Sequence, residues 1–86
     1  MKSTDYFRNV VPHKHPDVQL EWVQQVLENP VKQAVQTDGR RVYWGNIAEN
    51  NGRALRVVTL EDGETVHNAF FDRSFYRRQL RGEEPK

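Results

Sequence analysis

The stretch from Arg40 to Phe71, RRVYWGNIAENNGRALRVVTLEDGETVHNAFF, decides the fold of this chain. It contains three runs rich in β-branched and aromatic residues, separated by Asn50-Asn51-Gly52 and Glu61-Asp62-Gly63. Glycine after asparagine or aspartate is typical of tight hairpin turns, because those turns require positive φ angles. The pattern therefore predicts three antiparallel strands, at Arg40–Ala48, Ala54–Leu60 and Glu64–Phe71.

A helix and a further strand precede this stretch. Apolar residues recur from Leu20 at the spacing of one helix face, which predicts a helix from Gln19 or Leu20 to Glu28. Asn29-Pro30 ends this helix, because proline cannot continue it. Val31–Thr37 is then expected as a first core strand, and Asp38-Gly39 as the turn that leads into the second.

After the sheet, Asp72 or Ser74 can cap a short helix that continues to about Leu80. The order of elements predicts an α+β domain: one main helix packed on a four-stranded antiparallel meander sheet, with a short C-terminal helix. Residues 1–11 are expected to form an N-terminal arm or a short strand, residues 12–81 the single α+β domain, and residues 82–86 a flexible tail. Gly45, inside the second strand, is expected to mark a bulge or a close approach.

Composition narrows the class of protein. A chain of 86 residues is expected to form one domain, and a domain of this size buries only about 60% of the surface of its unfolded chain. Little room remains for a deep cofactor cavity, and no cofactor is expected. The absence of cysteine excludes disulfides, zinc–thiolate sites and thiol nucleophiles. No signal peptide or membrane-spanning run is visible, so we expect a cytoplasmic protein without a membrane partner.

The charge pattern allows only a local contact with nucleic acid. The formal net charge is +1, so a global basic field is absent. Arginines are concentrated in Asp72–Gly82, and an RNA contact would have to lie near such a cluster.

The end of the last strand collects groups that can act on phosphates. His67 ionises near neutral pH and can act as a general acid or base. Arg73 can hold a phosphate through paired hydrogen bonds. If Arg56 lies on the same sheet face as His67, these two residues form a basic pair on adjacent strands. Simple alternation puts His67 and Ala69 on one face, and Val66, Asn68 and Phe70 on the other. The alternative is that these residues have only a structural role: His67 is a half-exposed histidine in a strand, and Asp72-Arg73 begin a helix.

Other residues extend this candidate site. Tyr43 or Trp44 can stack on an unpaired base, although alternation puts at least one of them in the core. We expect Arg53 and Arg77 to contribute to substrate binding as well. A metal site formed by His13, His15 and His67 is a weaker alternative, because no carboxylate or thiolate pattern accompanies it, and no metal is expected.

Longer segments add a resemblance to a known group. The run LRVVTLEDGETVHNAFFDR from Leu55 to Arg73, together with Val18–Pro30, Asp38-Gly39-Arg40 and Tyr43-Trp44-Gly45, resembles small bacterial proteins related to the BrnT toxins and, more distantly, to the RelE and ParE toxins. The resemblance covers roughly Pro12 to Tyr76. It implies a helix on an antiparallel sheet, a small antitoxin partner and cleavage of messenger RNA without metal. By position, it assigns the catalytic roles to Arg56, His67 and Arg73.

Two functions are therefore expected. The first is the toxin-like component of a type II toxin–antitoxin module, acting as a metal-independent endoribonuclease on messenger RNA. The second is a non-catalytic protein-interaction module of the same fold, with Phe70-Phe71 and Phe75-Tyr76 as apolar anchors.

Overall fold

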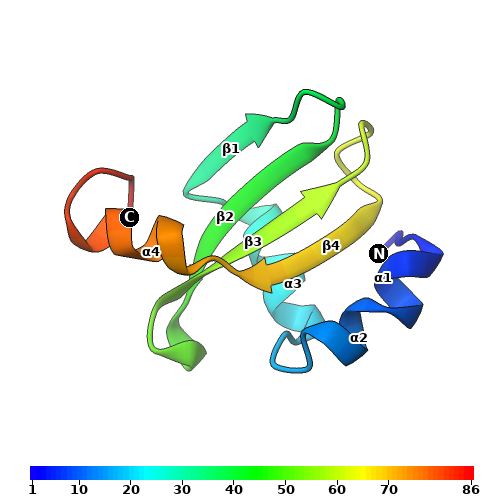
Figure 1. Ribbon diagram of the computed structural model, residues 1–86, viewed down its shortest axis with the longest axis horizontal. Coiled ribbons are helices and arrows are strands. Elements are labelled where there is room, and N and C mark those ends of the chain that lie inside the picture. The colour runs from blue at the N-terminus through cyan, green and yellow to red at the C-terminus, as the bar shows by residue number, and fades with distance from the viewer.

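The computed structural model describes residues 1–86 as a four-stranded antiparallel sheet with helices on both faces (Figure 1). The strands are β1 (Lys32–Val35), β2 (Arg41–Ile47), β3 (Arg53–Thr59) and β4 (Val66–Phe71), and they are paired in that order. The helices are α1 (Asp5–Asn9), α2 (Val11–Lys14), α3 (Leu20–Glu28) and α4 (Arg73–Leu80), with one 3-10 turn at Ala48–Asn50. The predicted α+β class and meander are confirmed.

The main helix covers one face of the sheet. α3 begins and ends where predicted, and it buries Trp22, Val23 and Val26 against the strands. Gly45 allows this packing, because a Cβ atom at that position would lie 2.9 Å from Val26 Cγ2. The expected close approach at Gly45 is therefore confirmed. We call this side of the sheet the α3 face.

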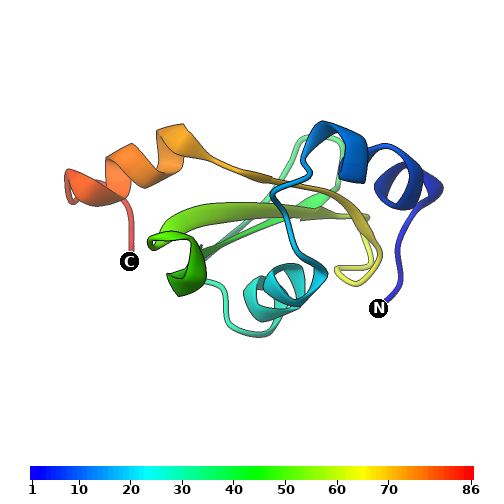
Figure 2. The same cartoon turned by 90° about the horizontal axis from the view of Figure 1, so that it is seen from below.

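The opposite side of the sheet, which we call the second face, is only partly covered. Figure 2 shows α3 on one side of the sheet, with α4 and the α1–α2 pair at the two ends of the other. Cross-strand partners share a face, so Trp44, Arg56 and Phe70 lie together on the second face. The uncovered part of this face lies between the two helical ends.

The N-terminal segment was predicted incorrectly as an arm or short strand. Thr4 caps α1 by accepting a hydrogen bond from the Phe7 backbone N–H at 3.1 Å. Phe7 and Val11 are buried in the same core cluster as the α3 side chains. The spacing of these two apolar residues suits successive helical turns, and their burial holds both short helices on the domain.

The first strand was also predicted incorrectly as a core strand. β1 is shorter than expected and forms an edge of the sheet, with Val35 67% exposed. The opposite edge is closed near its start, because the backbone of Lys2 and Thr4 is hydrogen-bonded to Val66. The β1 edge has no strand neighbour at all, whereas the β4 edge is paired with the N-terminal segment at Val66.

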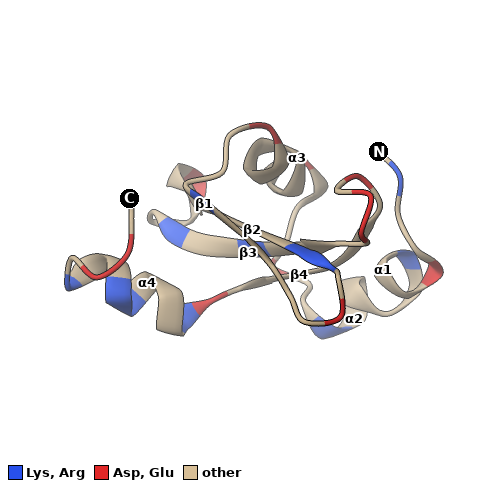
Figure 3. Cartoon of the chain, turned by 90° about the horizontal axis from the view of Figure 1, so that it is seen from above, with Lys and Arg blue, Asp and Glu red and all other residues tan.

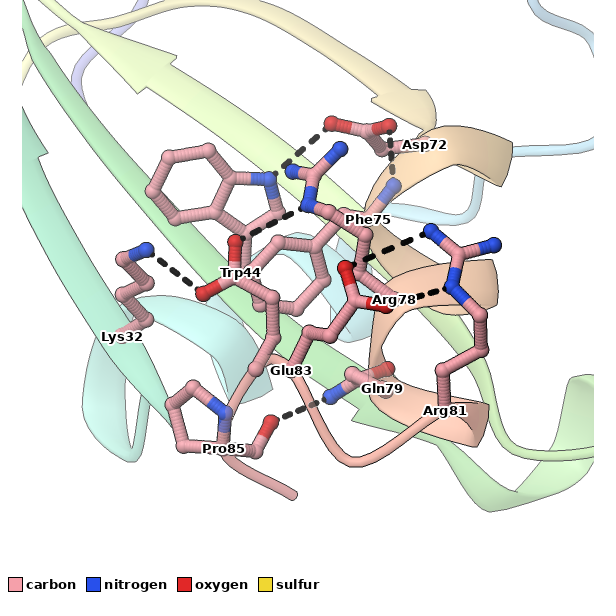
Figure 4. A network of polar contacts seen from close by, with 10 residues as sticks. Lys32, Trp44, Asp72, Phe75, Arg78, Gln79, Arg81, Glu83 and Pro85 are labelled. Atoms are coloured by element: carbon pink, nitrogen blue, oxygen red, sulfur yellow. Dashed lines mark hydrogen bonds and ion pairs between the residues drawn. The ribbon is translucent and has the colours of Figure 1, made fainter.

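The last residues contact the domain, unlike the flexible tail expected from the sequence. Glu84 accepts hydrogen bonds from Lys32 Nζ at 2.7 Å and from Arg78 Nε at 3.1 Å. Figure 4 shows the chain folding back so that the Pro85 carbonyl accepts a hydrogen bond from Gln79, at 2.7 Å. These contacts hold residues 84 and 85 against α4 and the start of β1.

Candidate functional site

A β-bulge decides where His67 lies. Val58 pairs with Asn68, but the next residue of β3, Thr59, pairs with Val66, so His67 is the extra residue. The predicted alternation is therefore wrong at this position. Val66 and Ala69 are both buried in the core, while His67 joins Asn68 and Phe70 around a hollow on the second face.

This hollow, which we call the histidine hollow, brings His67 and Arg56 together. It is shallow, encloses about 270 Å³, and is bordered by strand residues on one side and by α1 on the other. The lining side chains are Tyr6, Gln36, Arg40, Arg56, Val58, His67, Asn68 and Phe70. The condition set by the sequence, that Arg56 and His67 share a sheet face, is met.

The imidazole of His67 is held by α1. Thr4 Oγ1 lies 3.0 Å from His67 Nδ1, and the Tyr6 ring stacks on the imidazole with the ring centroids 5.0 Å apart. These contacts fix the orientation of the ring and leave Nε2 as the nitrogen free for a ligand. Burial lowers the pKa of His67, and the positive charge of Arg40 lowers it further. The imidazole is therefore neutral at neutral pH and can accept a proton.

Arg56 lies between two aromatic rings. Its guanidinium carbon lies 5.8 Å from the centroid of Trp44 and 5.3 Å from that of Phe70. Its Nε atom is buried without a hydrogen-bond partner. Both rings restrict the movement of the charged group, so the cation is held in place at the floor of the histidine hollow.

The aromatic pair predicted to stack on bases is mostly used for packing. Tyr43 is 8% exposed and belongs to the core on the α3 face, so its assignment as a base-stacking residue is wrong. Trp44 is on the second face, but its ring stacks on Phe75 of α4 with centroids 5.0 Å apart. Its indole N–H also donates to Asp72 Oδ2 at 3.1 Å, as Figure 4 shows. These contacts leave Trp44 holding α4 rather than open to a ligand.

Arg73 lies away from the other two predicted catalytic residues. It lines a second hollow of about 480 Å³, beside the start of α4, together with Arg53 and Arg77. We call this the arginine hollow. Phe70 lines both hollows, so its ring stands between them. The structure thus brings together His67 and Arg56, and separately Arg53, Arg73 and Arg77, but not all five.

The three histidines of the weaker metal alternative do not converge. No group of three or more His, Asp or Glu side chains is placed to hold a metal ion. His15 instead packs on Phe70, with ring centroids 5.7 Å apart, and His67 packs on Tyr6.

Sequence reasoning missed Thr4 and Tyr6, the two residues that position His67. A local signal for the helix was present, because Thr4 followed by Asp5 is typical of a helix N-cap and first turn. The contact with His67 had no such signal, since it joins residues 63 positions apart.

No protein-family model matches the chain, and neither a curated protein nor a solved structure is similar enough to count as a match. The resemblance to the BrnT and RelE toxins therefore stays a prediction from the sequence. None of the helices has the length and apolar character needed to cross a membrane.

Proposed function

We propose that this chain is the toxin-like component of a type II toxin–antitoxin module and cleaves messenger RNA without a metal ion. The observation that carries the proposal is the shared hollow of a neutral, oriented imidazole, His67, and an immobilised cation, Arg56. Metal-independent cleavage of RNA needs such a base and such a cation close to one phosphate.

In the proposed reaction, His67 Nε2 takes the proton of a ribose 2′-hydroxyl. The 2′-oxygen then forms a bond to the adjacent phosphorus, and the bond from phosphorus to the 5′-oxygen breaks. Arg56 stabilises the additional negative charge of the phosphate in the transition state. Tyr6, which borders the same hollow, carries the phenol that protonates the leaving 5′-oxygen. The products are a 2′,3′-cyclic phosphate and a free 5′-hydroxyl.

The first test is inducible expression in a bacterial host, with growth and bulk messenger RNA integrity followed over time. The wild-type chain is compared with His67→Ala and Arg56→Gln, and with His13→Ala as a matched control that removes an exposed histidine outside both hollows. Circular dichroism establishes that each variant is folded. Growth arrest and RNA cleavage that the first two substitutions relieve, and the control does not, would support the nuclease.

Purified protein gives a second readout. Cleavage of a short RNA in the presence of EDTA, ending in a 2′,3′-cyclic phosphate, is the expected result. Cleavage that stops on chelation, or that survives His67→Ala unchanged, would reject the proposed mechanism.

The proposed partner is a small antitoxin that adds a strand to β1. Residues 33–35 of this edge are exposed and carry no charge, and unpaired edges of this kind accept a strand from another chain. The opposite edge is less available, because Lys2 and Thr4 are already hydrogen-bonded to Val66 there.

A second candidate function, a non-catalytic protein-interaction module, is favoured by a different surface. An apolar hollow of about 640 Å³ lies between the N-terminal helices and the start of α3, and it includes Phe7, Val11 and Val18. Leu20 at its border is 62% exposed. Folded wild-type protein that leaves growth and RNA unchanged would favour this function over the nuclease.

A further inference from the structure

The arginine hollow gathers positive charge in a place that does not favour folding. Arg73 is the first residue of α4, where the helix dipole favours acidic residues, and the first turn contains none. Arg77 follows four positions later on the same side of the helix, and like charges at this spacing repel each other. Arg53, at the start of β3, adds a third cation to the hollow.

These three charges are not neutralised by ion pairs within the chain. None of the ion pairs of the protein includes Arg53, Arg73 or Arg77. Two carboxylates, Asp17 and Asp72, also line the hollow. Both oxygens of the Asp72 carboxylate already accept hydrogen bonds, Oδ1 from the Phe75 N–H and Oδ2 from the Trp44 indole N–H. Figure 3 shows Lys and Arg segments in blue along α4, with a red acidic segment directly before the helix.

The walls of the hollow point to the kind of anion that fits. Guanidinium groups bind phosphate oxygens in pairs, and Tyr76 offers a ring against which a base can stack. A volume of about 480 Å³ lies within the range of small-ligand sites. Phe70 also borders the histidine hollow, so a linear polyanion can pass from one hollow to the other along its ring.

We propose that the arginine hollow is a second phosphate-binding site, which holds a phosphate of single-stranded RNA next to the one bound at Arg56. The identity of the ligand rests on the proposed function, but the site does not take part in the cleavage step. Arg53, Arg73 and Arg77 hold the flanking phosphate, and Tyr76 contacts the base between the two phosphates. The site therefore contributes to affinity and to the position of the strand over His67.

The test measures binding of a fluorescein-labelled single-stranded oligonucleotide in which every 2′-hydroxyl is methylated. Such a strand cannot be cleaved by attack of the 2′-oxygen, so fluorescence anisotropy reports affinity alone. We expect Arg73→Gln and Arg77→Gln each to weaken binding at least fivefold and to reduce its salt dependence. The matched control is Arg81→Gln, which removes the same charge from the end of α4, where Arg81 pairs with Glu83 at 2.6 Å. The Arg81→Gln control should change the affinity for the oligonucleotide by less than twofold.

Arg73→Glu distinguishes a binding role from a structural one. The acidic side chain suits the first turn of α4, so this variant should melt at the same or a higher temperature while binding is lost. Equal weakening by Arg73→Gln and Arg81→Gln, or no binding by the wild-type chain, would overturn the second site. If the oligonucleotide binds through Arg73 while RNA stays intact in the cleavage assay, the second site stands and the nuclease fails. If the wild-type chain cleaves RNA and Arg73→Gln changes neither cleavage nor affinity, the nuclease stands and the second site fails.

Discussion

The carboxylate of Asp72 joins the start of α4 to the indole of Trp44. One oxygen caps the helix by accepting from the Phe75 N–H at 3.0 Å, and the other accepts from Trp44 Nε1 at 3.1 Å. The same Trp44 ring stacks on Phe75, so the hydrogen bond and the stacking fix α4 over the second face. This arrangement sets the boundary between the covered and uncovered parts of that face.

Replacing Asp72 should release α4. We expect Asp72→Ala to lower the free energy of unfolding by about 1–3 kcal/mol, since it removes a helix cap and a partner of a half-buried N–H. Asp72→Ser keeps a capping oxygen but loses the indole contact, so its effect should be smaller. Urea unfolding of Asp72→Ser, Trp44→Phe and the double variant measures the coupling. Strictly additive effects would contradict the link between the two side chains.

The buried amide of Gln79 should stabilise the other end of α4. Gln79 is 1% exposed, and its side chain exchanges two hydrogen bonds of 2.8 Å with Asn46 of β2. Gln79→Met keeps the length of the side chain but removes its hydrogen bonds to Asn46 and to the Pro85 carbonyl, and should cost about 1–3 kcal/mol in unfolding free energy. Gln24→Met, on the exposed side of α3, is the control and should change stability by less than about 0.5 kcal/mol.

His67 should make stability depend on pH in mildly acidic solution. Its pKa in the folded protein lies below the ordinary value of 6.5, because burial and Arg40 disfavour the charged form. The unfolded chain therefore binds more protons in this range, and stability is highest above pH 6.5 and falls as the pH drops toward the folded-state pKa. Urea midpoints between about pH 5 and pH 7.5 measure this slope. His67→Gln should flatten it, and His13→Gln should leave it unchanged.

Gly45 should tolerate no side chain as long as Val26 faces it. The added Cβ of Gly45→Ala would lie 2.9 Å from Val26 Cγ2, so α3 has to move outward. We expect a loss of about 1–3 kcal/mol in unfolding free energy. Val26→Ala removes the opposing methyl groups, so the double variant should be more stable than the sum of the two losses predicts. If the double variant loses as much unfolding free energy as the two single variants together, the contact with Val26 is not the cause of the destabilisation by Gly45→Ala.

The strands, the turns and the main helix were predictable because their signals are local. Gly39 has a φ angle of +89°, as the predicted Asp38-Gly39 turn requires. The apolar spacing of α3 and the proline after it fix both ends of that helix within a few residues. These features depend on backbone preferences and periodicity, which neighbouring residues specify without help from the rest of the chain.

The arrangement of the candidate site was not predictable in the same way. The bulge that moves His67 to the side of Arg56 depends on how β4 pairs with β3, and the contacts of Thr4 and Tyr6 depend on how α1 packs. The sequence by itself determined which residues form strands, turns and the main helix, since short-range backbone preferences decide those. Only the tertiary structure decided that Tyr43 is buried, that His67 meets Arg56, and that Arg73 lies beyond Phe70. Each of these follows from contacts between segments far apart in the chain, whose register no local pattern encodes.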